Sequence, residues 1–167
     1  MSAPPFMLST FALCVLLTTS CNRSTPVSVP QKLHIEITGG DFEWHVRYAG
    51  LDEVFGTADD FFARRNVALI SNTPTTIDLK SDDYIYSFAL PHLNLREIAV
   101  PDLVFSLEFS PKELGEFKLK GDQLCGYQHP KLIGKVRVLS PRDFARWFGN
   151  AASRNRDQHG DSKTRDE

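Results

Sequence analysis

Residues 32–48 read KLHIEITGGDFEWHVRY, and the predicted fold class rests first on this stretch. Apolar side chains at Leu33, Ile35 and Ile37 alternate with polar ones, which is the period-two pattern of a half-buried β-strand. After a turn expected at residues 39–41, a second alternation runs through Phe42, Trp44, Val46 and Tyr48. The two runs predict two β-strands, each with one face turned toward a hydrophobic core.

The rest of the chain repeats this pattern in short segments separated by turn residues. Further strand candidates are residues 67–70, 75–79, 84–89, 103–109, 117–120 and 134–139. Many short strands at this spacing are typical of a β-sandwich or barrel. One helix is expected after Ser140, which can cap it, with Pro141 at its first position and Asp143 in its first turn. Its packing face is Phe144, Trp147 and Phe148.

The composition is that of one ordinary globular domain. The 167 residues are 41% apolar and 24% charged, and the formal net charge is −2. These values exclude a disordered chain and a strongly basic nucleic-acid-binding protein. No run of apolar residues reaches the ~20 that span a bilayer, so a polytopic membrane protein is excluded as well.

The first twenty residues contain no charged side chain and include an apolar run at 11–17, followed by Thr18, Thr19, Ser20 and Cys21. A short apolar core, then small residues and a cysteine, resembles a bacterial lipoprotein signal in which the cysteine receives the lipid. An ordinary cleaved signal peptide and a single short membrane anchor are the alternatives. All three place the remainder in the cell envelope, facing the periplasm or the exterior, and we expect Cys21 to be lipidated.

Four segments are expected along the chain. Residues 1–20 are the signal, 21–30 a linker rich in Ser, Thr and Pro, 31–148 the folded domain and 149–167 a tail. The tail is predicted to be disordered because it is highly charged and contains almost nothing apolar.

The loop at residues 121–132 reads GDQLCGYQHPKL and contains the residues with the most distinctive chemistry. Cys125 and His129 are four residues apart between two late strands, and copper proteins present a thiolate and an imidazole in this way. The spacing alone fits a buried structural cysteine beside an unrelated exposed histidine at least as well.

Several stretches in fixed order carry a resemblance to a known family. They are FEWHVRYAG at 42–50, FGTADD at 55–60, SDDYIYSFALP at 81–91, LNLR at 93–96, QLCGYQH at 123–129 and FARW at 144–147. In this order they resemble the copper-binding extramembrane domain of cytochrome c oxidase subunit II. The resemblance covers residues 40–147 and implies an all-β, cupredoxin-like Greek-key sandwich with a short C-terminal helix.

The chain departs from this family at the two-copper centre. In the family, two cysteines bridge two coppers, each copper takes one histidine, and a methionine and a backbone carbonyl complete the ligands. Carried over by position, the first histidine falls on Tyr86, the first cysteine on Gly121 and the methionine on Leu132. The retained positions are Cys125, His129 and Gln123, the last through its backbone carbonyl. Since one thiolate cannot make a doubly bridged pair, the resemblance implies a mononuclear copper site at most, or none.

A mononuclear site would need a further nitrogen ligand. His92, directly after Pro91, is the candidate that the sequence offers, and its alternative role is that of an exposed loop histidine. The aromatic residue through which electrons enter in the family falls on Phe42, for which the alternating pattern also allows a place in the core.

Two alternative functions, from different classes, are compatible with the sequence. The first is an electron-transfer or copper-binding domain, held at the membrane by a lipid anchor, with cytochrome c or oxidase-type membrane subunits as partners. The second is a metal-free structural or assembly module of a respiratory or copper-handling complex. No catalysis is expected from this chain alone. A thiol hydrolase built on Cys125 and His129 lacks an orienting third group, the acidic residues at 52–60 lack EF-hand spacing, and no basic stripe indicates nucleic acid.

Overall fold

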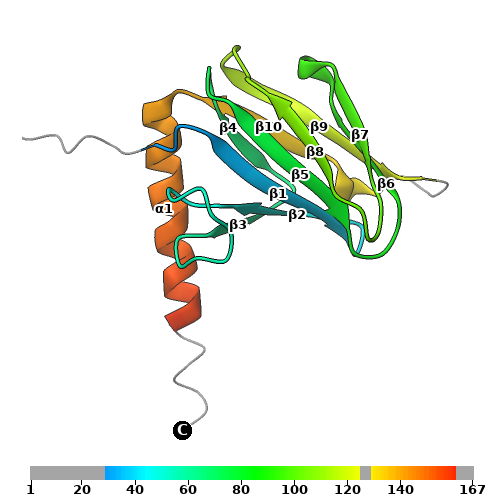
Figure 1. Cartoon of the computed structure of the whole chain (residues 1–167), viewed down its shortest axis with the longest axis horizontal. Helices are drawn as coiled ribbons and strands as arrows, with labels where there is room; N and C mark the ends of the chain where they lie inside the picture. The colour runs from blue at the N-terminus through cyan, green and yellow to red at the C-terminus, as the bar shows by residue number, and fades with distance from the viewer. Residues whose placement is uncertain (1–28, 125–128, 161–167) are drawn as a thin grey trace, which may run out of the picture.

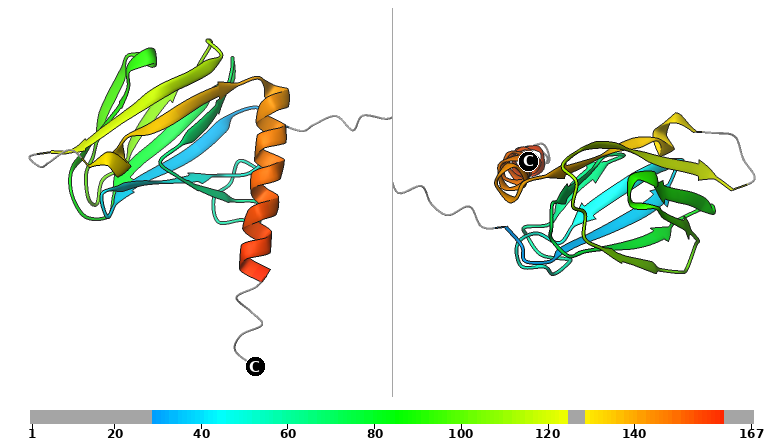
Figure 2. Two further views of the ribbon diagram at one scale, coloured as in Figure 1. Left: turned by 180° about the vertical axis from the view of Figure 1, so that it is seen from behind. Right: turned by 90° about the horizontal axis from the view of Figure 1, so that it is seen from above.

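Two five-stranded β-sheets pack face to face, with one helix against an end of the sandwich (Figure 1, Figure 2). This computed structural model describes residues 29–124 and 129–160, and side chains as far as residue 151. The predicted all-β sandwich with a C-terminal helix is confirmed. The predicted signal at 1–20, Cys21 and Cys125 lie outside the described residues.

Each sheet combines strands that are far apart in the sequence. In spatial order the first sheet is β3 (Phe61–Arg64), β2 (Glu43–Tyr48), β1 (Leu33–Gly40), β5 (Thr75–Ser81) and β8 (Phe105–Phe109). The second is β4 (Val67–Ile70), β10 (Gly134–Leu139), β9 (Gly115–Gln123), β6 (Tyr86–Leu90) and β7 (Leu95–Ala99). β1 runs parallel to β5 and β10 runs parallel to β4, whereas the other neighbours are antiparallel. The strands β3 and β7 were not predicted.

The first alternating stretch forms the hairpin of β1 and β2, but its turn differs from the prediction. The connection is Asp41 and Phe42, both with positive φ (51° and 59°), and the predicted turn glycines end β1 instead. Positive φ at both central residues is type I′ geometry, which suits a two-residue hairpin but is rare for a bulky side chain. The alternating pattern predicted that Trp44 and Phe42 face the core. This is confirmed for Trp44, which is fully buried, but not for Phe42, which is half-buried in the turn.

Glycine ends β1 because the chain packs closely there. A Cβ atom on Gly39 would lie 2.5 Å from Cδ2 of Tyr86 and 3.1 Å from Cζ3 of Trp44. Real side chains do not approach so closely. Gly39 is therefore required by the contact between the two sheets, and the turn forms two residues later.

The helix α1 (Pro141–Gly160) begins as predicted. The Ser140 hydroxyl oxygen accepts the backbone N–H of Asp143 at 3.2 Å and its O–H donates to the Asp143 carboxylate at 2.7 Å. The Ser140 hydroxyl group therefore caps the start of the helix. The helix then continues to Gly160 and extends past the sheets (Figure 1), where the sequence predicted a disordered tail from residue 149. Gly149 and Asn150 are typical helix-stop residues, but no proline interrupts residues 142–160 and the helix continues through them.

The first helical turns cover the end of the core. Phe144 is buried, and the Trp147 ring meets Tyr48 and Phe61 edge-on, with ring centres 5.5 Å and 5.4 Å apart. Within the described parts of the chain, no helix combines the length and apolar character needed to cross a membrane.

Tyr48 joins β2 to β4 through its hydroxyl group, deep in the core. The hydroxyl oxygen accepts the Ala68 N–H at 2.7 Å, and its O–H is 3.3 Å from the Ala68 carbonyl oxygen, to which it donates. Burial raises the pKa of Tyr48 above its ordinary value, so the phenol stays protonated.

We expect Tyr48→Phe to lower the free energy of unfolding by about 1–3 kcal/mol, since it leaves buried backbone groups of Ala68 without their partner. Urea denaturation followed by circular dichroism measures the change. Tyr84→Phe, at a ring that is 48% exposed, is the matched control and should change stability by less than about 0.5 kcal/mol. Equal losses in the two variants would contradict the prediction.

Candidate functional site

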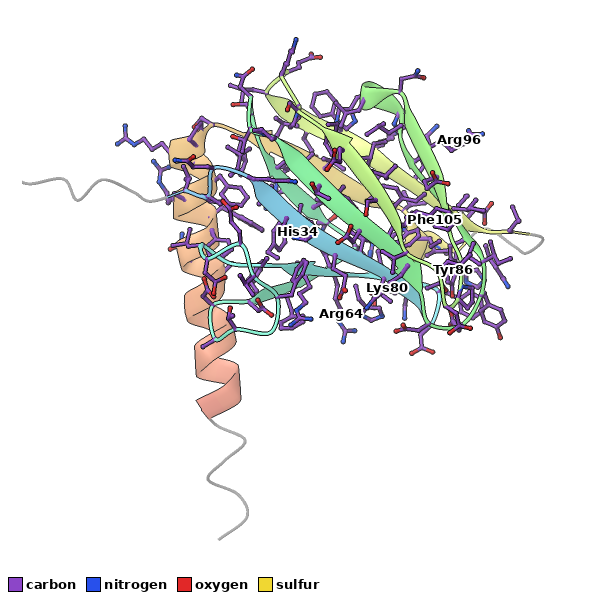
Figure 3. All side chains as sticks on the ribbon, in the orientation of Figure 1. His34, Arg64, Lys80, Tyr86, Arg96 and Phe105 are labelled. Carbon is purple, nitrogen blue, oxygen red and sulfur yellow. The ribbon has the colours of Figure 1, made fainter. Side chains whose placement is uncertain are left out.

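Most of the positions singled out in the sequence meet at one end of the sandwich. Tyr86, the first residue of β6, pairs with Gln123, the last residue of β9. The chain returns to this end at His129, which precedes the short 3-10 helix η2 (Pro130–Leu132). Figure 3 labels Tyr86 at this end of the sheets. Cys125 lies between these segments in sequence, outside the described residues.

The His129 imidazole stacks on the Phe42 ring. The ring centres are 4.0 Å apart and the planes are inclined by 19°. Phe42 also stacks on Tyr84, with ring centres 5.2 Å apart and planes inclined by 22°. The left-handed backbone of Phe42 is what turns its ring out of the β2 core face and toward His129. Such uncommon backbone conformations cluster at functional sites.

Tyr86 occupies the position that the resemblance assigns to the first histidine. It is fully buried, and its hydroxyl donates to Oδ1 of Asp83 at 2.7 Å and accepts the Phe42 N–H at 3.3 Å. The second Asp83 oxygen accepts the Asp41 N–H at 2.8 Å. Burial, and then Asp83, raise the pKa of Tyr86, so its oxygen is a protonated hydrogen-bond donor.

Gly121, which the resemblance assigns to the position of the first bridging cysteine, lies against Trp44. The Trp44 indole N–H donates to the Leu132 carbonyl at 2.9 Å. A Cβ atom on Gly121 would lie 2.6 Å from the indole nitrogen and 2.7 Å from the Leu132 carbonyl oxygen. The Trp44–Leu132 hydrogen bond therefore fills the space into which a side chain at residue 121 would project. The Leu132 side chain, which the resemblance assigns to the methionine position, is itself fully buried.

His92 lies away from this group. It belongs to the 3-10 helix η1 (Pro91–Leu93), which follows the other end of β6, roughly 13 Å along the strand from Tyr86. Its imidazole stacks on Phe117 with ring centres 4.1 Å apart. Both ring nitrogens are buried without a hydrogen-bond partner in the described part of the chain, and burial lowers the pKa of His92. The structure thus does not bring His92 close to His129. His92 is also not an exposed loop residue, because its ring nitrogens are buried.

Two roles at this end were not predicted from the sequence. They are the acceptor role of Asp83 toward Tyr86 and the donor role of Trp44 toward Leu132. The second has a general signal, because a buried indole N–H usually needs an acceptor. Among the residues that the structure describes, which do not include Cys125, no group of three His, Cys, Asp or Glu side chains could hold a metal ion.

Comparison with curated proteins finds distant relatives of one kind. The chain is 25% identical over 145 residues to the alternative cytochrome c oxidase subunit 2 of Bradyrhizobium diazoefficiens, which covers 73% of this chain and 52% of that protein. It is 26% identical over 95 residues to the cytochrome c oxidase subunit 2 of Cereibacter sphaeroides, covering 56% and 31%. The chain thus spans about half or less of the length of these relatives. No family model matches the sequence.

Two solved structures share the fold. The periplasmic domain of subunit II of cytochrome oxidase (CoxB) of Bradyrhizobium japonicum matches with a TM-score of 0.62 and 21% identity, covering 73% of this chain and 94% of that one. A mixed disulfide between a thioredoxin-like protein and subunit II of cytochrome c oxidase matches with a TM-score of 0.62 and 22% identity, covering 73% and 92%. The sheet arrangement described above is therefore that of a cupredoxin domain.

We expect Gly121→Ala to lower the free energy of unfolding by about 1–3 kcal/mol, because the new methyl group collides with Trp44 and with the Leu132 carbonyl. Thermal or urea denaturation measures the loss. Gly40→Ala is the matched control, since a Cβ atom there meets nothing closer than 3.7 Å. A tolerated Gly121→Ala, or an equal loss in both variants, would contradict the assigned packing.

The Tyr86–Asp83 hydrogen bond should make stability depend on pH in the acid range. Burial alone would raise the pKa of Asp83, but hydrogen bonds from the Tyr86 hydroxyl and from the N–H groups of Tyr84 and Asp41 outweigh burial and lower it. A lowered folded-state pKa means that ionised Asp83 stabilises the fold above its unfolded pKa of about 3.9, and that this contribution is lost as the pH falls through the folded value.

Tyr86→Phe removes one of these hydrogen bonds, so it should cost more stability at pH 7 than at pH 2. Urea denaturation at several pH values measures the difference between wild type and variant. Asp82→Asn changes the neighbouring exposed carboxylate, and its stability difference from wild type should not shrink in this way between pH 7 and pH 2. A Tyr86→Phe loss that stays constant from pH 7 to pH 2 would show that Asp83 does not contribute through this bond.

Proposed function

Because the chain carries a cytochrome c oxidase subunit II-like cupredoxin domain, we propose that it serves electron transfer or copper binding in the cell envelope, with an incomplete form of that subunit's metal site. The proposed copper ligands are Cys125, His129 and the backbone carbonyl of Gln123. Thiolate and imidazole together suit copper better than hard cations. A bound copper ion would supply a one-electron redox couple.

The position of His129 is the observation that carries this proposal. Its half-buried imidazole stands at the end of the sandwich, beside the Gln123 end of β9 and against Phe42. Phe42 is also the position of the family's electron-entry aromatic, so a redox partner that contacts the turn at residues 41–42 would lie close to the proposed ligand. The stack of Tyr84, Phe42 and His129 supports this end as the contact surface.

The limit to one ion is supported by the other positions of the site. The protonated hydroxyl of Tyr86 is engaged with Asp83. Gly121 provides no ligand, and the indole of Trp44 takes up the space beside it. Two bridging thiolates are needed for a dinuclear centre, and this loop has one.

A metal-free structural or assembly module is the second candidate function. The hydrogen bonds Trp44–Leu132 and Tyr86–Asp83 favour it, because they hold this end of the sandwich together with protein groups alone. In either function, we propose that the domain is exported and lipidated at Cys21, and that its partners are cytochrome c or oxidase-type membrane subunits.

Metal analysis of the full chain distinguishes the copper-binding domain from the metal-free module. After loading with copper(I) and desalting, we expect at most one copper per chain, reduced to background in Cys125→Ser and in His129→Ala. His92→Ala is the matched histidine control and should retain wild-type copper. Circular dichroism confirms that each variant is folded.

Each other outcome has a meaning. Two coppers per chain would contradict the one-ion limit. Copper that is lost in His92→Ala as well would move the ligand set away from the His129 end. Folded wild-type protein without copper would reject the copper proposal and favour the metal-free module.

A further inference from the structure

The outer face of the second sheet is hollowed along β6. The hollow has a volume of about 1060 Å³ and extends over β7, β6, β9 and the residues before β10. Its floor is low because β6 presents the small side chains of Ser87 and Ala89 outward. Long side chains stand on both sides, since Arg96 of β7 and Lys120 of β9 are the register partners of Ala89. Figure 3 shows Arg96 projecting from β7.

The lining of this basic hollow is strongly positive. Five basic side chains face two acidic ones, namely Arg65, Arg96, Lys118, Lys120 and Lys135 against Glu97 and Asp122. The whole chain has a formal net charge of −2, so positive charge is concentrated on this face. Of these five basic residues, Lys135 alone has an ion-pair partner in the described part of the chain, Glu116 at 2.6 Å.

The placement of these charges does not help the fold. Lys118 lies directly opposite Lys135 in the β9–β10 ladder, and Lys120 follows on the same face of β9. Like charges directly opposite each other destabilise a sheet. The Lys135–Glu116 ion pair offsets part of this repulsion, and a ligand that brings negative charge to Lys118 and Lys120 would reduce it further.

Apolar side chains line the same hollow. Ile98, Leu124 and Ile133 are 38%, 51% and 45% exposed, which is unusual for large aliphatic residues gathered at one place. Basic side chains around exposed apolar groups complement a polypeptide with carboxylates on either side of an apolar residue. A flat membrane surface would reach the basic rim but not the floor at Ala89.

We propose that the basic hollow binds an acidic segment of a partner protein. Carboxylates of the partner contact Arg96, Lys118 and Lys120, and an apolar side chain of the partner lies over the floor beside Ile98 and Leu124. This interaction surface does not involve His129 or a metal ion, so it stands apart from the proposed copper function.

A short peptide is the direct probe. Fluorescence anisotropy measures binding of labelled Glu-Glu-Leu-Glu-Leu-Glu-Glu to the full chain, at low salt and at physiological salt. We expect saturable binding that weakens with salt, and the double variant Arg96→Ser/Lys120→Ser should weaken it about tenfold, as for the loss of two charge contacts. The same peptide with Lys in place of Glu should not bind.

The matched control is Lys32→Ser/Lys80→Ser, which removes the same charge from Lys80 of β5 and from Lys32, just before β1, both of which have acidic partners. It should leave peptide binding unchanged. Equal weakening in the two double variants, or no peptide binding by folded wild type, would overturn the proposal. Binding to phosphatidylglycerol–phosphatidylcholine vesicles without binding to the peptide would also overturn it and assign the face to the membrane.

Discussion

The hydrogen bond from the Trp44 indole to the Leu132 carbonyl is the contact on which the candidate site depends. It joins β2 of the first sheet to η2, which precedes β10 of the second, across the buried end of the sandwich. Its geometry requires glycine at residue 121, because any Cβ atom there would meet both bonded groups. The bond thus places the segment after His129 and at the same time excludes a ligand at residue 121.

Much of the fold follows from patterns that the sequence displays openly. The alternation in β1 and β2 and the cap at Ser140 are local signals, since they depend on residues two to four positions apart. The hairpin turn was misplaced because Gly39 has a different reason to be glycine, namely its contact with Tyr86. That reason arises only when the two sheets pack together, so no local pattern contains it.

The candidate site shows the same difference between what the sequence contains and what only the packing of the two sheets creates. The resemblance located Tyr86, Gly121, Gln123, His129 and Leu132, and the structure places all of them near one end of the sandwich. The resemblance did not place His92. In the structure this residue follows the far end of β6, the strand that begins at Tyr86, and it therefore lies away from His129. Nor could the resemblance show that Trp44 fills the space beside Gly121, which depends on a contact between residues 44 and 132.

The end of β9 connects the candidate site to the basic hollow. Toward the interior, Gly121 lies against Trp44 and Gln123 pairs with Tyr86. Toward the outside, Gly121 and Asp122 line the basic hollow beside Leu124. A glycine at residue 121 therefore allows the indole to close the interior, while the backbone at the same residue lies in the lining of the hollow. The position that the resemblance assigns to a bridging thiolate is, in this chain, a packing contact between the two sheets.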